Sequence, residues 1–152
     1  MGTAQAGQLV WVDSSNISSY SYNYGDDCDN DWSHIMWRGA VASAFCGRRG
    51  QAFLREMLAA LDALPEKRLV KNELEADGQV CALGAVGKAR GLDMKEIDPE
   101  DSEGVANEFD VAHAMVCEIM YQNDDGVAYW VEETPERRFG RMRCWIESVI
   151  KS

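Results

Sequence analysis

The stretch QAFLREMLAALDALPEK, residues 51–67, is the most regular part of this 152-residue chain. Its apolar side chains recur at intervals of three and four residues: Phe53, Leu54, Met57, Leu58, Leu61 and Leu64. This spacing predicts an amphipathic helix that buries one face. Pro65 predicts where the helix ends, because proline cannot continue it.

Helical patterns also occupy the regions on either side of this stretch. The segment 31–46 carries a broad stripe of apolar or small side chains at positions 32, 36, 40, 41, 44 and 45, and the sequence Gly-Arg-Arg-Gly at 47–50 predicts its end, with glycine free to take the left-handed cap. Asp98 and Pro99 predict the start of a short helix that ends near Phe109, and Asp110 is expected to cap the helix that follows, residues 111–122.

The last helix is predicted to start at Thr134-Pro135-Glu136, with Phe139, Met142, Ile146 and Val149 facing inward. Residues 67–91 are ambiguous. They fit a hairpin that turns at Ala76-Asp77-Gly78, or a short helix of small residues from about 79 to 90, which we favour. The predicted fold is therefore mainly α: a single domain over residues 1–152, built as an irregular bundle of five or six short helices. The sequence also allows one small β-hairpin within it. Residues 1–30 are polar, and we expect them to form a loosely packed N-terminal segment.

Composition limits the classes of function. The chain has 26 Asp and Glu against 15 Lys and Arg, a net charge of −11, which disfavours direct binding of nucleic acid. It has no apolar run of the ~20 residues that a membrane helix needs and no secretory signal, so a cytoplasmic protein is expected. Its five cysteines are scattered and form no C-x-x-C pair, which argues against a disulfide framework and a zinc knuckle.

The acidic stretch GDDCDNDWSH, residues 25–34, raises the question of a metal site. Asp27, Asp29 and Asp31 have the spacing of the first calcium ligands of an EF-hand. Trp32 stands where that loop requires glycine, and Arg38 stands where it requires glutamate, so calcium binding of this type is excluded. A zinc site is disfavoured because histidine is scarce, and we predict no metal here.

No stretch predicts catalysis or a cofactor. A Cys–His pair is numerically possible, but no cysteine lies in a recognisable nucleophile motif. The run GAVGKA at 84–89 has the wrong spacing for a phosphate-binding loop, and His113 is expected to be structural. The segment 103–120 has the rhythm of a helix-turn-helix, but its second helix lacks Lys and Arg. We therefore predict no catalytic, cofactor-binding or metal-binding residue, and keep a small DNA-binding regulator only as the alternative.

Four stretches of the chain carry a resemblance to known proteins: GRRGQAFLREMLAALDALPEKRL (47–69), DGQVCALGAVGKARGLD (77–93), VANEFDVAHAMVCEIMYQND (105–124) and TPERRFGRMRCWI (134–146). Together they resemble an uncharacterised family of small proteins from phages and prophages of proteobacteria. The resemblance implies a mobile-element accessory gene and brings no activity. Such genes often encode inhibitors of host defence, among them anti-CRISPR proteins.

We therefore expect a non-enzymatic inhibitor that binds a host nucleoprotein complex, with a CRISPR effector as the first candidate. The contact would be an acidic surface facing a basic groove, which would block nucleic-acid binding or nuclease recruitment. The expected contact residues are Asp26, Asp27, Asp29, Asp31, Glu75, Asp77, Glu132 and Glu133. A homodimer is left open.

Overall fold

The computed structural model describes residues 31–152, and for residues 31–34 only the backbone. This part of the chain is mainly helical, with one two-stranded antiparallel sheet, as predicted. Its elements are α3 (Asp31–Cys46), α4 (Arg48–Ala63), β1 (Glu75–Ala76), β2 (Gln79–Val80), α5 (Ala82–Arg90), the 3-10 helix η2 (Met94–Glu96), α6 (Ser102–Phe109), α7 (His113–Asp125) and α8 (Pro135–Val149).

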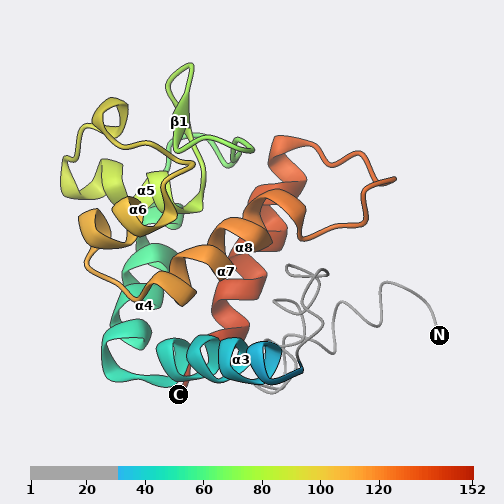
Figure 1. The fold of residues 1–152 in the computed structure, drawn as a ribbon. Helices are drawn as coiled ribbons and strands as arrows, with labels where there is room; N and C mark the ends of the chain where they lie inside the picture. Colours follow the sequence, from blue (N-terminus) through green and yellow to red (C-terminus); the bar gives the residue numbers. More distant parts are fainter. Residues whose placement is uncertain (1–30) are drawn as a thin grey trace.

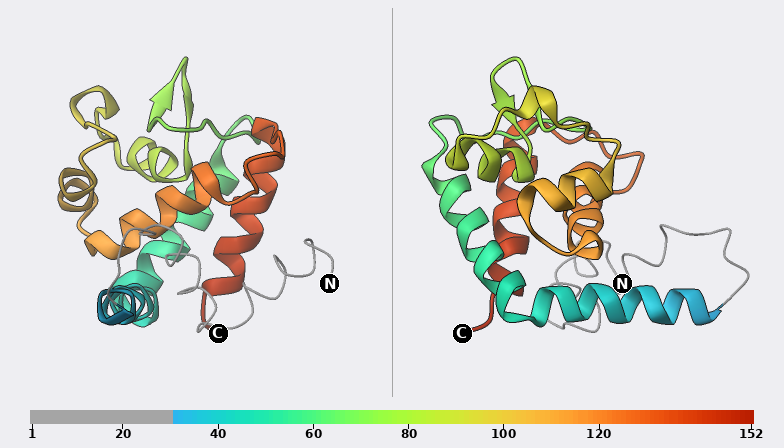
Figure 2. Two further views of the ribbon diagram at one scale, coloured as in Figure 1. Left: turned by 45° about the vertical axis from the view of Figure 1, so that its right-hand side comes forward. Right: turned by 60° about the vertical axis from the view of Figure 1, so that its left-hand side comes forward.

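The core lies between α4, α5, α7 and α8, and α3 closes one end of it (Figures 1 and 2). The helix predicted from residues 51–67 is α4, and Phe53, Leu54, Met57 and Leu61 are buried in it. Helix α8 begins with Thr134 as its N-cap and Pro135 at its first position, as predicted, because the Thr134 hydroxyl accepts the Arg137 N–H at 3.2 Å. The four inward residues expected on α8 are all buried.

Helices α3 and α4 meet at a corner at Gly47, which the right-hand view of Figure 2 shows clearly. The prediction of a left-handed glycine cap there is wrong: Gly47 has φ −69° and ψ 158°, an extended residue that begins α4. Only part of the predicted stripe on α3 is buried. Val41 and Phe45 lie in the core, whereas Met36 is 60% exposed. The right-hand view of Figure 2 shows that the first half of α3 extends beyond the other described helices.

Residues 75–90 contain both of the structures between which the sequence left a choice. Glu75 pairs with Val80 and Ala76 with Gln79 across a two-residue turn of Asp77 and Gly78. Both turn residues have positive φ, 52° and 78°, the conformation that suits the twist of a tight hairpin. Helix α5 then starts at Ala82, later than the predicted 79, because Cys81 is extended and its Sγ caps the Gly84 N–H at 3.3 Å.

The predicted caps of the next two helices are wrong. Asp98 does not start a helix; its Oδ1 accepts the Glu100 N–H at 2.9 Å in a turn, and Asp101 is the N-cap of α6. Asp110 ends α6 in the left-handed conformation, with φ 54° and ψ 49°, and does not cap α7. Helix α7 consequently begins at His113, two residues later than predicted.

Candidate functional site

The structure describes the backbone position of five of the eight predicted contact residues. Asp26, Asp27 and Asp29 lie outside the described residues, and Asp31 is the first residue of α3, with its side chain not described. Glu75 is half-buried in β1, and Asp77 is exposed in the hairpin turn. Glu132 and Glu133 lie in the loop between α7 and α8, where their environments differ sharply.

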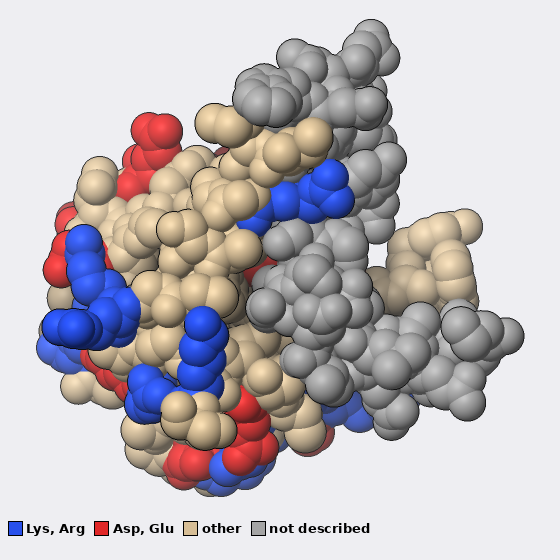
Figure 3. Space-filling model, turned by 90° about the horizontal axis from the view of Figure 1, so that it is seen from below, with Lys and Arg blue, Asp and Glu red and all other residues tan. Residues whose placement is uncertain are grey.

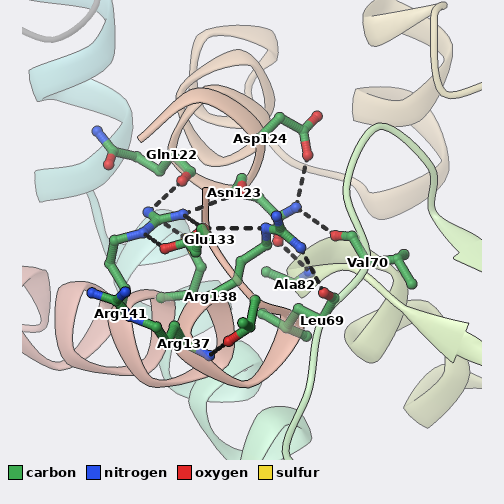
Figure 4. Close-up of polar contacts among 12 residues, drawn as sticks. Leu69, Val70, Ala82, Gln122, Asn123, Asp124, Glu133, Arg137, Arg138 and Arg141 are labelled. Atoms are coloured by element: carbon green, nitrogen blue, oxygen red, sulfur yellow. Dashed lines mark hydrogen bonds and ion pairs between the residues drawn. The ribbon is translucent and has the colours of Figure 1, made fainter. Parts of the chain in front are cut away.

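Glu133 forms the centre of a shielded ion-pair cluster (Figure 4). Its two carboxylate oxygens accept hydrogen bonds from Arg141 Nε at 2.6 Å and Nη2 at 2.9 Å, and Arg138 Nε lies 3.3 Å from Oε1. The side chain of Glu133 is only 7% exposed. Its charge is thus committed within the fold, so we do not include Glu133 among the residues offered to a partner.

The same cluster connects separate parts of the chain (Figure 4). Arg138 Nη1 donates to the Leu69 carbonyl at 2.9 Å, and Arg141 Nη2 donates to the Asn123 carbonyl at 3.3 Å. The side chain of Asn123 donates to the Val70 carbonyl at 2.9 Å and accepts the Ala82 N–H at 3.2 Å. The end of α7, the start of α8 and the segment that leads to β1 are therefore fixed relative to one another.

The loop held by this cluster carries an exposed aromatic pair. Tyr129 is 95% exposed and Trp130 is 68% exposed, and their rings pack edge to face with centroids 5.0 Å apart. In Figure 1 this loop projects from the body of the molecule on the right. Sequence reasoning missed it. The available signal was a Tyr-Trp pair with no helical or strand periodicity around it, between the turn formers at 123–126 and the start of a helix at Thr134.

A second missed feature is the acidic segment, residues 93–110, which spans η2 and α6. It holds eight acidic residues and one lysine, a net charge of −7: Asp93, Glu96, Asp98, Glu100, Asp101, Glu103, Glu108 and Asp110, against Lys95. All eight are exposed. The other described residues, 31–92 and 111–152, contain 14 acidic and 14 basic residues and are neutral together. The signal was the charge run itself, readable without a structure.

The acidic segment divides into carboxylates with local structural roles and carboxylates without them. Asp93, Asp98 and Asp101 each accept a backbone N–H within the segment, at 3.0, 2.9 and 3.0 Å, and so fix its turns. Asp110 pairs with Arg49 at 2.8 Å. Within the described part of the chain, the four glutamates, Glu96, Glu100, Glu103 and Glu108, form no ion pair and make no side-chain hydrogen bond. These four are available to an external cation.

Three of the four arginines of α8 are paired with acidic side chains. Arg138 and Arg141 bind Glu133, and Arg143 binds Asp62 at 2.6 Å and Glu147 at 2.9 Å. Seen from the side of α3, the described surface shows Lys and Arg interspersed with Asp and Glu (Figure 3). The excess of negative charge in the described residues is thus a property of the acidic segment.

One group of side chains has the composition of a nucleophilic site. His113 Nε2 lies 2.8 Å from Ser102 Oγ and 3.3 Å from Cys117 Sγ. Burial raises the pKa of the Cys117 thiol, and a hydrogen bond with Ser102 opposes this only partly. Burial therefore disfavours the thiolate, the reactive form. The structure thus brings together the Cys–His pair that the sequence left open, in surroundings that do not activate it.

Among residues 31–152 no group of three or more His, Cys, Asp or Glu side chains is placed to hold a metal ion. None of the helices in that range combines the length and the apolar character that a membrane span requires. The helix-turn-helix alternative meets a steric obstacle, because α7, its second helix, buries eight of its 13 residues and has no Lys or Arg.

Comparisons with known proteins identify no relative. No protein-family model matches the chain, no curated protein matches it, and no solved structure matches its fold.

Proposed function

We propose that this chain is a non-enzymatic interaction protein that binds a host nucleoprotein complex through an acidic surface and so blocks nucleic-acid binding or nuclease recruitment. The resemblance to phage and prophage proteins makes a bacterial defence complex in the host cytoplasm the proposed target, with a CRISPR effector first. The acidic segment, residues 93–110, takes the leading role in the contact. Asp77 and Glu132 are exposed and contribute to it. Asp26, Asp27, Asp29 and Asp31 are included in the proposed contact.

The observation that carries this proposal is the concentration of negative charge. A net charge of −7 within 18 residues lies on an exposed segment, while the remainder of residues 31–152 is neutral. A groove that binds nucleic acid is lined with Lys and Arg and is built for about one negative charge per 1.7 Å of duplex axis. Glutamates without internal partners can pair with the Lys and Arg of such a groove as phosphates do.

The alternative, a DNA-binding regulator, receives no such support. Its would-be recognition helix is the central buried helix of the fold, and phosphate repels the acidic segment that precedes it. An electrophoretic mobility assay with duplex DNA at low salt separates the two functions. The inhibitor should give no shift, and a salt-sensitive shift would favour the regulator.

The test of the proposal is charge reversal in the acidic segment. The triple variant Glu96→Lys, Glu100→Lys, Glu103→Lys is compared with a control of equal net charge, Glu66→Lys, Glu73→Lys, Glu147→Lys, which reverses exposed glutamates elsewhere. Binding to purified CRISPR effector complexes, and to complexes captured from proteobacterial lysates, is measured over a range of salt concentrations. The first variant should bind at least tenfold more weakly at low salt with a flatter salt dependence, and the control should bind nearly as the wild type does.

A third variant reverses Asp26, Asp27, Asp29 and Asp31 and tests the contribution of the N-terminal aspartates. If neither this variant nor Glu96→Lys/Glu100→Lys/Glu103→Lys changes the affinity or its salt dependence, the acidic-surface proposal is wrong.

A further inference from the structure

The loop between α7 and α8 exposes apolar surface that the fold does not use. Tyr129, Trp130 and Val131 are three of the five large hydrophobic residues that are exposed among the described residues, and they are consecutive. Trp130 alone exposes 68% of its surface to solvent. Burying such a side chain in a partner is strongly favourable, and Trp and Tyr are the residues most enriched at the energetic centres of protein interfaces.

This loop is positioned before any partner arrives. The Val131 N–H donates to the Ala128 carbonyl at 2.8 Å and closes the turn that carries the two rings. Immediately after the turn, Glu133 is bound through both oxygens by Arg141, and Thr134 caps α8. A loop ordered in advance loses little conformational freedom on binding, which is the condition under which exposed aromatic residues yield affinity.

The surroundings of the rings indicate the chemistry of the partner. The sequence DDGVAYWVEE, residues 124–133, has four acidic residues and no basic one. Asp125 and Glu132 are exposed on either side of the aromatic pair, and a hollow of about 370 Å³ beside it is lined by Trp130, Glu132 and Lys71 among others. A partner that receives these rings must offer an apolar pocket with Lys or Arg at its rim.

We propose that Tyr129 and Trp130 are the anchor by which this protein docks on its target, with the rings filling an apolar pocket on a folded protein whose rim is basic. The inference rests on the proposed function for the identity of the target. It adds that specificity lies in the aromatic loop, whereas the acidic segment supplies salt-sensitive attraction. The charges of Asp125 and Glu132 favour a basic protein over an anionic lipid surface or a second copy of this acidic chain.

The experiment compares Tyr129→Ala/Trp130→Ala with Tyr129→Phe/Trp130→Phe, which keeps the aromatic surface, and with Met36→Ala, which removes another exposed apolar side chain. The probe is the nucleoprotein complex that the wild type binds in the charge-reversal experiment, purified and titrated against each variant at low and high salt. The alanine variant should bind at least 30-fold more weakly at both salt concentrations, while the phenylalanine variant and Met36→Ala should stay within about threefold of the wild type. All variants should unfold at the same temperature, because these side chains are exposed.

Each other result contradicts the inference in a recognisable way. If the alanine variant binds as the wild type does while charge reversal in the acidic segment weakens binding, the proposed function stands and the aromatic anchor does not. If the alanine variant captures every complex that the wild type captures, the aromatic anchor is also excluded. Binding to phosphatidylcholine vesicles that is lost in the alanine variant would reassign the loop to a lipid surface. Sedimentation showing a dimer that the alanine variant cannot form would reassign it to self-association.

Discussion

Glu133 binds the guanidinium of Arg141 through both carboxylate oxygens, at 2.6 and 2.9 Å, with only 7% and 17% of the two side chains exposed. This pair ties the end of the exposed loop to α8, and Arg141 in turn reaches the carbonyl groups at the end of α7. The pair therefore links the loop that exposes Tyr129 and Trp130 to the buried part of the fold.

Removing the charge of Glu133 should destabilise the protein. In Glu133→Gln the guanidinium groups of Arg141 and Arg138 stay buried without a counter-charge, and breaking a shielded ion pair in this way costs about 3 kcal/mol. The free energy of unfolding, measured by urea denaturation followed by circular dichroism, should fall by that amount. The neighbouring substitution Glu132→Gln affects an exposed side chain and should change it by ~0.5 kcal/mol or less. Equal effects of the two substitutions would contradict the role assigned to Glu133.

Periodicity and end signals were sufficient to predict the class of fold and several of its helices. Helices α4 and α8 carry long, strongly amphipathic patterns, so burial of one face decides their structure and the sequence displays that face. The predicted caps of α6 and α7 failed for a different reason. Asp98, Asp101 and Asp110 are all competent caps, and which of them caps a helix depends on packing that a local pattern does not contain.

The same limit applies to the contact residues. Glu132 and Glu133 are adjacent and identical, yet one is exposed and the other is held by Arg141 from a helix that begins later in the chain. No local rule separates them. The charge run at 93–110 and the Tyr-Trp pair at 129–130 were both readable, by contrast, and were overlooked because they resemble ordinary solvated surface.

The pair of Glu56 and Arg90 should give the protein a measurable acid sensitivity. Arg90 donates to both oxygens of Glu56, at 2.7 and 2.8 Å, and this hydrogen bonding lowers the pKa of Glu56 below its ordinary value of 4.5. The stabilisation is therefore present above the unfolded-state pKa and is lost as the pH falls through the lowered pKa of the folded state. Both side chains are about a third exposed, so solvent screening limits the contribution to ~1 kcal/mol or less.

The measurement is the difference in unfolding free energy between the wild type and Glu56→Gln as a function of pH. It should be largest near neutral pH and should shrink as the pH falls below 4.5. A difference that does not depend on pH would show that the carboxylate charge contributes nothing.

The four described cysteines should differ widely in their reaction with alkylating reagents. Burial raises the pKa of Cys81 to about 12, and burial also raises the pKa of Cys117, so both stay as unreactive thiols. Cys46 and Cys144 are exposed. Iodoacetamide at mildly alkaline pH should modify Cys46 and Cys144 first, as read by peptide mass spectrometry, and should modify Cys81 and Cys117 only as the protein unfolds. In concentrated urea all four should react at similar rates. Rapid modification of folded Cys81 would contradict its place as the buried cap of α5.

Two glycine-to-alanine substitutions should change stability in opposite directions. Helix α5 packs so closely on the hairpin that a Cβ at Gly84 would overlap the Leu74 carbonyl oxygen and lie 3.0 Å from Val80 Cβ. The backbone there cannot yield easily, because the same carbonyl accepts the Cys81 N–H at 3.1 Å. Gly84→Ala should therefore lower the unfolding free energy by roughly 2–3 kcal/mol, as overpacking of a well-packed core does.

A Cβ at Gly140, in the exposed interior of α8, meets nothing within 4 Å. Gly140→Ala should raise the unfolding free energy by about 0.5–1 kcal/mol, because alanine has less freedom to lose when the helix forms. Urea denaturation of both variants beside the wild type measures the two signs in one experiment. A Gly84→Ala protein as stable as Gly140→Ala would show that α5 does not pack against the hairpin as described.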